Sequence, residues 1–311
     1  MEKSGSFILR EFGYRPMAIT EAVQAMLDKK VPVLDHGFVV LVDVMGDDEA
    51  IVQAARVSYG KGTKSMTENR GLVRYLMRHR HTTPFEMVEM KFHVKLPIFV
   101  ARQWIRHRTA NVNEYSARYS IMEDEFYLPE ADVIAEQSAS NKQGRGETID
   151  TTAAAEVRQA IEGHNKASYG LYEELMQGED GADKGLAREI ARITLPTNIY
   201  TQWYWKIDLH NLLHFLSLRM DPHAQYEIRE YANKMGEMVK AAAPLAWEAF
   251  EDYSINVMRL TGPEITVLRQ LLKSTEVSDD VFAETCKATG FANKREQGEL
   301  RDKLERLLSG N

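Results

Sequence analysis

The segment Val88–Arg108, with the sequence VEMKFHVKLPIFVARQWIRHR, predicts a strand that leads directly into a helix. Its first part alternates apolar and polar residues, which is typical of a strand with one buried face. Pro97 suits the first turn of a helix, and we expect that helix to continue to residue 108. Strands of this kind are mixed with helices and do not alternate strictly with them. The pattern therefore favours an α+β fold over a doubly wound parallel sheet.

Outward from this segment, apolar runs and periodic patterns predict further elements. We expect strands at 38–44, 111–128 and 199–207. Amphipathic patterns predict helices within 1–35, at 65–80, 151–177 and 208–220, after Pro222, and through 255–309. The leucines of the last segment, Leu300, Leu304, Leu307 and Leu308, form a stripe that favours packing on the chain itself or on a sister subunit. Residues 130–150 predict a loop or mobile insertion, and 178–185 a glycine-rich break.

Composition excludes several classes of protein. The 311 residues carry 39 Lys and Arg against 46 Asp and Glu, a formal charge of −7, which argues against a protein that coats DNA or anionic membranes. The single cysteine, Cys286, excludes an internal disulfide and a CxxC zinc site. Residues 1–6 do not resemble a signal peptide, and no apolar run reaches the length of a membrane span. We expect a cytoplasmic protein.

Three local patterns resemble functional motifs and fail their chemical requirements. Gly60-Lys61 lacks the glycine that a phosphate loop needs, so a turn is expected. His210 and His214 lie one helical turn apart, but Asn211 stands where a zinc hydrolase has its catalytic glutamate. No metal is therefore expected, although this pair can line a polar pocket. Cys286 has no histidine near it in sequence and is expected to be structural or merely tolerated.

Two basic windows interrupt the acidic background. Residues 70–81 carry a charge of +4, and residues 101–120 carry +3. The second window continues into closely spaced hydrogen-bonding side chains between Asn111 and Tyr119. Arginine binds phosphate through its planar fork of N–H donors, so this window predicts an anion site. A solvated helix end that complements the helix dipole is the alternative.

The same residues carry a family resemblance. Arg106-His107-Arg108, followed after seven residues by Ser116, resembles the RHR-x7-S signature of flavin-dependent thymidylate synthases. The earlier Arg78-His79-Arg80 does not fit, because Val88 stands where the serine belongs. Further blocks of the family resemble residues 81–86, 97–104, 113–120, 192–196 and 219–227.

The resemblance covers about residues 38–128 and 187–252 and implies a thymidylate synthase-complementing fold with a central, largely antiparallel sheet flanked by helices. The implied synthase domain is 1–252, with an insertion at about 130–185, and 253–311 is a helical C-terminal extension.

The resemblance also implies an activity. Such enzymes methylate dUMP to dTMP with 5,10-methylenetetrahydrofolate as carbon donor, FAD as cofactor and NADPH as reductant. They form homotetramers whose active sites combine residues from several subunits. The only cysteine lies outside the matched region, so the reaction is expected to proceed without a cysteine nucleophile. No nucleic acid or membrane partner is implied.

The family's functional residues map onto matching positions of this chain. The implied catalytic residue is Arg219, with an ion pair to Asp221 as the alternative. The implied dUMP site is Gln103, Trp104, Ile105, Arg106, Glu114, Tyr115, Ser116, Ala117, Arg118, Arg192 and Arg219. The implied FAD site is Thr83, Arg106, His107, Arg108, Glu114, Asp208, Leu209, His210 and His214, with His81 on the flavin or folate face.

Two parts of the sequence depart from the family's pattern. Asp208, His210 and His214 replace a block that often reads Asn-x-Arg with a later Asn, and ionised Asp208 cannot donate a hydrogen bond. We expect Asp208 to use its backbone or to cap the helix. Ala117 replaces a common glycine, which would strain the backbone if that position needs a positive φ.

Two other functions remain as alternatives. One is a different flavin- or nucleotide-dependent enzyme on the same scaffold. The other is a nucleic-acid-binding module that uses the basic windows, which predicts binding that falls steeply with salt.

Overall fold

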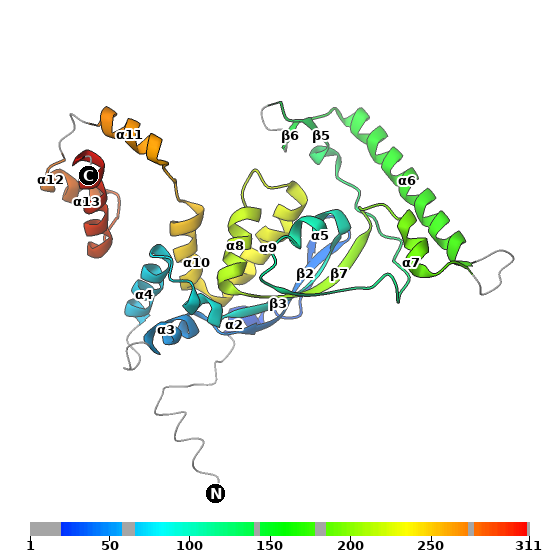
Figure 1. Ribbon diagram of the computed structural model, residues 1–311, viewed down its shortest axis with the longest axis horizontal. Coiled ribbons are helices and arrows are strands. Elements are labelled where there is room, and N and C mark those ends of the chain that lie inside the picture. The colour runs from blue at the N-terminus through cyan, green and yellow to red at the C-terminus, as the bar shows by residue number, and fades with distance from the viewer. Residues whose placement is uncertain (1–19, 58–65, 140–143, 178–184, 273–276, 310–311) are drawn as a thin grey trace, which may run out of the picture. The chain divides into compact units, whose positions relative to one another are not determined.

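The computed structural model describes residues 20–57, 66–139, 144–177, 185–272 and 277–309 (Figure 1). The chain divides into two compact units, Met1–Asn256 and Val257–Asn311, which are described separately. The expectations for residues 1–6, for the turn at Gly60-Lys61 and for most of the glycine-rich break lie outside the described residues.

The first unit is built on a five-stranded sheet in which every neighbouring pair is antiparallel. In spatial order its strands are β1 (Val31–Val33), β2 (Gly37–Met45), β3 (Glu89–Pro97), β7 (Tyr200–Asp208) and β4 (Asn111–Glu114). The strands predicted at 38–44, 88–94 and 199–207 are confirmed, and so are the α+β class and the antiparallel sheet.

The register of β3 and β7 separates the two faces of the sheet. Phe92 lies opposite Trp205 and Val94 opposite Trp203, and all four side chains are buried. His93 lies opposite Tyr204 on the other face, where the two rings stack with centroids 4.9 Å apart. The alternation seen in the sequence thus sends one set of side chains into the core.

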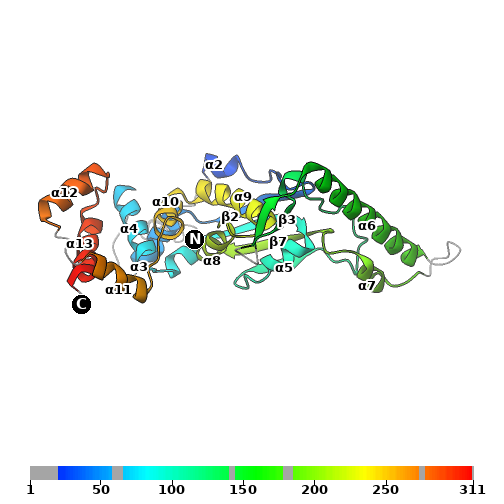
Figure 2. The same cartoon turned by 90° about the horizontal axis from the view of Figure 1, so that it is seen from above.

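Three helices supply the other side of that core: α5 (Ile98–Trp104), α8 (Leu209–Arg219) and α9 (Tyr226–Ala242) (Figures 1 and 2). Trp104 at the end of α5 is fully buried. Its ring contacts those of Trp203, Trp205, Phe215 and Tyr231, with centroids 4.7 to 5.9 Å apart. The last residue of α5 is therefore fixed by strand and helices together.

The other helices of this unit are α2 (Glu21–Gln24), α3 (Asp48–Val57), α4 (Met66–Arg78), α10 (Pro244–Phe250), the π turn Glu251–Ile255 and the 3-10 turn η1 (Thr83–Met87). The sequence patterns predicted α4 and missed α3. The helix predicted at 151–177 is confirmed as α6 (Thr151–Gln177), and α7 (Arg188–Ala191) and η4 (Arg192–Thr194) follow it.

Three boundaries predicted from sequence are wrong. Helix α5 ends at Trp104 and not at residue 108, because the chain must turn at once to begin β4. The strand predicted at 111–128 is limited to β4, since a hydrogen-bonded turn from Ser116 to Ser120 interrupts it. The loop predicted at 130–150 contains the 3-10 turn η2 (Ala131–Val133) and the two-stranded sheet of β5 (Ala135–Gln137) and β6 (Arg145–Thr148).

The second unit contains α11 (Gly262–Leu271), α12 (Asp279–Ala288) and α13 (Lys294–Ser309), as the charged helical pattern predicted. Leu300, Leu304, Leu307 and Leu308 on α13 are half-buried, and Cys286 on α12 is a buried free thiol. Within the described residues, no helix combines the length and apolar character needed to cross a bilayer.

Candidate functional site

The turn after α5 presents the basic motif at the surface. The backbone N–H of His107 donates to the carbonyl of Trp104, which closes a tight turn directly after the buried tryptophan. Arg106 and Arg108 are exposed on either side of His107, which is half-buried. The buried Trp104 therefore fixes the start of a turn whose two arginines face solvent.

His107 reaches back to helix α8. The Nε of Arg219, the last residue of α8, donates to Nε2 of His107 at 3.1 Å. The His107 ring also lies edge-on to Phe215, with centroids 4.9 Å apart, and 5.9 Å from the ring of His214. Three residues predicted for the site from distant segments, His107, His214 and Arg219, are thus brought together.

The alternative partner for Arg219 is not used. Asp221 accepts from the backbone N–H of His223 at 2.8 Å and lies 2.9 Å from the Nδ1 of the same histidine. Among the ion pairs of the described residues, none joins Arg219 to Asp221, the predicted alternative.

Burial and neighbouring positive charge control the protonation of this pair. Burial, together with the charges of Arg219 and His214, lowers the pKa of His107 from 6.5 to about 4. His107 is therefore a neutral imidazole at neutral pH. Burial also lowers the pKa of Arg219, but a guanidinium remains charged.

A pocket of about 190 Å³ opens beside the turn. Aromatic and basic side chains line it, among them Trp104, His107, Arg108, Trp203 and Trp205. Among the described residues, the buried indole Nε1 atoms of Trp104 and Trp203 and the Oε1 of Gln103 have no hydrogen-bond partner. A buried polar group without a partner costs about 1–3 kcal/mol, so these three atoms are suited to a ligand that carries both acceptors and donors.

Strand β4 places a second group of predicted residues beside β7. Glu114 ends β4, and its exposed carboxylate accepts from the hydroxyl of buried Thr201 at 2.9 Å. The backbone then turns through Tyr115, Ser116 and Ala117, and the Oγ of Ser116 accepts from the Arg118 N–H at 3.3 Å. Positive φ occurs elsewhere in the described chain and not at Ala117, so alanine is unstrained there.

Contacts with α7 bring Arg118 toward the segment that carries Arg192. The Arg118 guanidinium lies 2.9 Å from a carboxylate oxygen of Glu189 on α7, and Arg188 donates to the carbonyl of Tyr119 at 2.7 Å. Arg192 begins the next turn, η4, and is exposed. Both arginines predicted to bind phosphate thus lie on neighbouring, solvent-accessible segments.

Asp208 caps helix α8. One of its carboxylate oxygens accepts from the backbone N–H of Asn211 at 2.9 Å, and the other accepts from the Asn211 side chain at 2.7 Å. The capping alternative for Asp208 is therefore the one used. Leu209 is buried in the core, whereas His210 is partly exposed on the first turn of the helix.

His81 and Thr83 lie at the 3-10 turn η1, which packs against helix α8. Both are exposed around η1, and the His81 ring packs against Tyr75 with centroids 5.7 Å apart. Within the described ranges, no hydrogen bond or ion pair joins His81 or Thr83 to the residues around His107.

The first basic window is partly neutralised. Arg70 and Arg74 donate to Glu248, and Arg74 also donates to Asp252. Arg74 and Arg78 further contact Tyr253. This window therefore joins α4 to the segment that begins with α10, and the sequence alone did not reveal its acidic partners.

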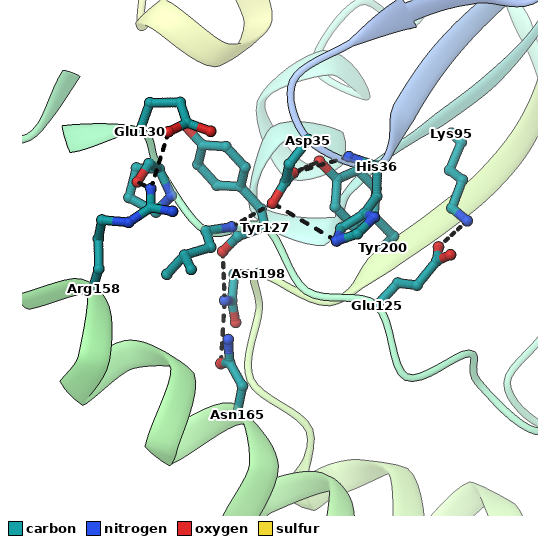
Figure 3. Close-up of polar contacts among 12 residues, drawn as sticks. Asp35, His36, Lys95, Glu125, Tyr127, Glu130, Arg158, Asn165, Asn198 and Tyr200 are labelled. Carbon is teal, nitrogen blue, oxygen red and sulfur yellow. Dashed lines mark hydrogen bonds and ion pairs between the residues drawn. The ribbon is translucent and has the colours of Figure 1, made fainter. Parts of the chain in front are cut away.

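Sequence reasoning also missed a polar cluster that holds the segment after the site (Figure 3). Asp35 accepts from the backbone N–H of Leu128 at 2.8 Å and from the hydroxyl of Tyr200 at 2.6 Å. Asn198 donates to the carbonyl of Tyr127 at 2.9 Å and to Asn165 of α6 at 3.2 Å. These are single polar residues from remote segments, so no motif could have identified them.

A related set of contacts surrounds buried Glu227 of α9. Its carboxylate accepts from Tyr127 at 3.0 Å, from Gln225 at 2.9 Å and from the guanidinium of Arg145 on β6. This carboxylate joins the small β5–β6 sheet to the core.

The site combines cationic side chains and unpaired hydrogen-bonding groups with an aromatic pocket on an antiparallel α+β scaffold, a combination that suits an anionic ligand with a planar ring. A family model described as thymidylate synthase complementing protein matches residues 40–245. The chain belongs to this family.

Similar proteins agree with that assignment. A flavin-dependent thymidylate synthase of Gluconobacter oxydans is 57% identical over 259 residues, covering 83% of this chain and 84% of the relative. The enzyme of the same description from Ruegeria pomeroyi is 53% identical over 288 residues, covering 93% and 92%. The family implied by the sequence resemblance is thus confirmed, and the description of these relatives names a thymidylate synthase activity and a flavin.

Solved structures share the fold. Two crystal structures of a UMP/dUMP methylase from Streptomyces cacaoi, bound with 5-bromo-UMP and 5-bromo-dUMP, match with TM-scores of 0.64 and 0.65. The two structures are 35% and 33% identical in sequence to this chain. Each match covers 72% of this chain, and the matches cover 98% and 99% of the methylase chains.

Proposed function

We propose that this protein methylates dUMP to dTMP, with 5,10-methylenetetrahydrofolate as carbon donor, FAD as cofactor and NADPH as reductant. The observation that carries the proposal is the meeting of His107 of the basic turn with Arg219 beside an aromatic pocket. The bound pyrimidine nucleotides of the Streptomyces methylase and the activity named for the relatives support it. The unit Met1–Asn256 is the proposed synthase domain.

In this proposal dUMP lies across the turns that follow α5 and β4. Ser116, Arg118 and Arg192 bind its phosphate, and the exposure of both arginines leaves them accessible to it. Binding phosphate would compete with the Arg118–Glu189 pair, which is weak because both side chains are about half exposed. Gln103, whose Oε1 is buried without a partner among the described residues, supplies an acceptor to the nucleotide. The backbone and side chains of Trp104, Ile105, Arg106, Glu114, Tyr115 and Ala117 complete the proposed site.

Arg219 is the proposed catalytic residue. Carbon 5 of uracil becomes nucleophilic when negative charge develops on the pyrimidine ring, and a fixed cation beside the ring stabilises that charge. The guanidinium of Arg219 is half-buried, and its Nε is already committed to His107. Its terminal nitrogens are then the groups proposed to face the pyrimidine.

The residues near the pocket fit a flavin. The aromatic wall suits a planar ring, and the unpaired indole N–H groups of Trp104 and Trp203 suit its carbonyl oxygens. The proposed FAD contacts are Thr83, Arg106, His107, Arg108, Glu114, Leu209, His210 and His214, with His81 on the flavin or folate face and Asp208 acting through its cap. The bound reduced flavin supplies the methylene-transfer and hydride chemistry, and the protein supplies position and electrostatics.

We further propose a homotetramer with shared active sites. Within the described residues His81 and Thr83 make no polar contact with the His107 group, and large apolar side chains are exposed around the site. These include Ile105, Val112, Tyr119, Ile121, Ile190 and Ile193. Such apolar exposure marks an interaction surface.

The test is release of tritium from [5-³H]dUMP by purified, flavin-loaded protein supplied with NADPH and methylenetetrahydrofolate. We expect release together with dTMP formation, and UMP serves as the competing substrate. Arg219→Ala should keep its flavin and lose turnover. No release from flavin-loaded wild-type protein would overturn the proposed reaction, and near wild-type turnover of Arg219→Ala would remove that residue from it. Mass measurement in solution tests the tetramer.

A further inference from the structure

The hydrogen bond between Arg219 and His107 fixes the protonation state of the histidine. The Nε of a guanidinium carries one N–H and can only donate, so the Nε2 of His107 at 3.1 Å must accept. An imidazole nitrogen accepts only when it carries no proton. His107 is therefore neutral in this arrangement, with its proton on Nδ1.

The surroundings of the ring favour this neutral form. Phe215 lies edge-on to it, the titratable groups beside it are Arg219 and His214 of α8, and Arg106 and Arg108 on its own segment face solvent. No carboxylate forms an ion pair with His107 in the part of the chain that the structure describes. A second proton would therefore enter a partly buried site that is already positive, which agrees with the lowering of the pKa of His107 to about 4.

A neutral acceptor and a carboxylate would affect the charge of Arg219 differently. An aspartate or glutamate at this place would hold the guanidinium equally well but would cancel much of its charge. A neutral imidazole directs Arg219 and leaves the full positive charge available to a substrate. It also engages only Nε, which leaves both terminal nitrogens of Arg219 without a partner among the described residues.

We propose that His107 is a positioning residue that orients Arg219 through a neutral Nε2 acceptor while preserving the charge of the guanidinium. This inference rests on the proposed role of Arg219 toward the pyrimidine of dUMP. It assigns the middle residue of the basic turn a task distinct from flavin contact, and it leaves Nδ1–H as the only donor of that ring.

Three substitutions at position 107 distinguish the effect of the hydrogen-bond acceptor from the effect of the charge on that side chain. His107→Gln places a neutral oxygen acceptor near the position of Nε2, His107→Leu removes the acceptor at similar volume, and His107→Glu keeps an acceptor but adds negative charge. For each variant we would measure kcat per bound flavin by tritium release, the flavin content by absorbance, and the dUMP dissociation constant by calorimetry.

We expect His107→Leu to lower kcat per bound flavin by about 10- to 100-fold, because a misdirected catalytic group costs that much. His107→Gln should recover most of that loss, and His107→Glu should remain as low as His107→Leu. Equal impairment of the Gln and Leu variants, or normal turnover of either the Leu or the Glu variant, would overturn the proposal.

Crystal structures of the variants without substrate give a second readout that does not depend on activity. Arg219 should keep its place in His107→Gln and move away in His107→Leu, whereas an unmoved Arg219 in His107→Leu would overturn the positioning role. The two proposals can fail separately. If the wild-type protein forms no dTMP, but Arg219 keeps its place in His107→Gln and moves away in His107→Leu, then the proposed reaction is wrong and the positioning role of His107 is still supported.

Discussion

Arg145→Ala is the substitution whose effect on stability can be worked out most directly from the structure. Glu227 is 2% exposed and carries a charge that Arg145 balances. Removing one partner of a buried ion pair costs about 3–5 kcal/mol, because the other charge is left without compensation. The Arg145 side chain is 37% exposed, and Tyr127 and Gln225 continue to donate to the carboxylate. We therefore expect a loss of about 2 kcal/mol, below that range.

Urea-induced unfolding of the full chain, followed by tryptophan fluorescence, measures this loss. Lys166→Ala is the matched control, since it removes a fully exposed pair with Glu162 at 2.6 Å, and exposed pairs of this kind contribute little to stability. Hydrogen exchange in β5 and β6 should also quicken in Arg145→Ala, because this residue holds the small sheet to α9. A loss no larger than that of the control, with unchanged exchange in β5 and β6, would refute the reasoning.

Three further predictions concern the site. Asp208→Ala removes the cap that accepts from Asn211 and should lower stability by about 1 kcal/mol, measured by thermal unfolding, whereas an unchanged midpoint would contradict the capping role. Thr201→Val removes the hydroxyl that donates to Glu114 and should weaken dUMP binding about fivefold by calorimetry, with unchanged affinity as the contrary result. The folded pKa of His107 is about 4 against 6.5 for an unperturbed histidine, so the unfolded state binds more protons at this residue between those values, and the contribution of His107 to stability should fall as pH falls from 6.5 to 4. After allowance for solvent screening this amounts to about 1.5 kcal/mol, and it should be absent in His107→Gln, which an equal pH dependence of the two proteins would contradict.

The sequence predicted the fold where periodicity alone decides the structure. The alternation from Val88 to Val94 and the aromatic run before Asp208 each gave a strand, because one face of each pairs into a common core. Helix α6 was predicted at its observed bounds. The helix after Pro97 was predicted too long, since the need to turn into β4 overrides the helical pattern from residue 105 onward.

The sequence also determined that the site is basic and suited to an anion, because Arg106-His107-Arg108 and Ser116 lie close together in one segment of the chain. Only the tertiary structure decided which arginines pair with acidic side chains of the protein and which remain free to bind a ligand. It paired Arg70 and Arg74 with acids more than 170 residues away, and it brought Arg219 to His107 across 112 residues. Pairings over such separations depend on how strands and helices pack, and no local pattern records them. The protonation state of His107 follows from that packing, because burial and the charge of Arg219 act on the ring only when the chain is folded.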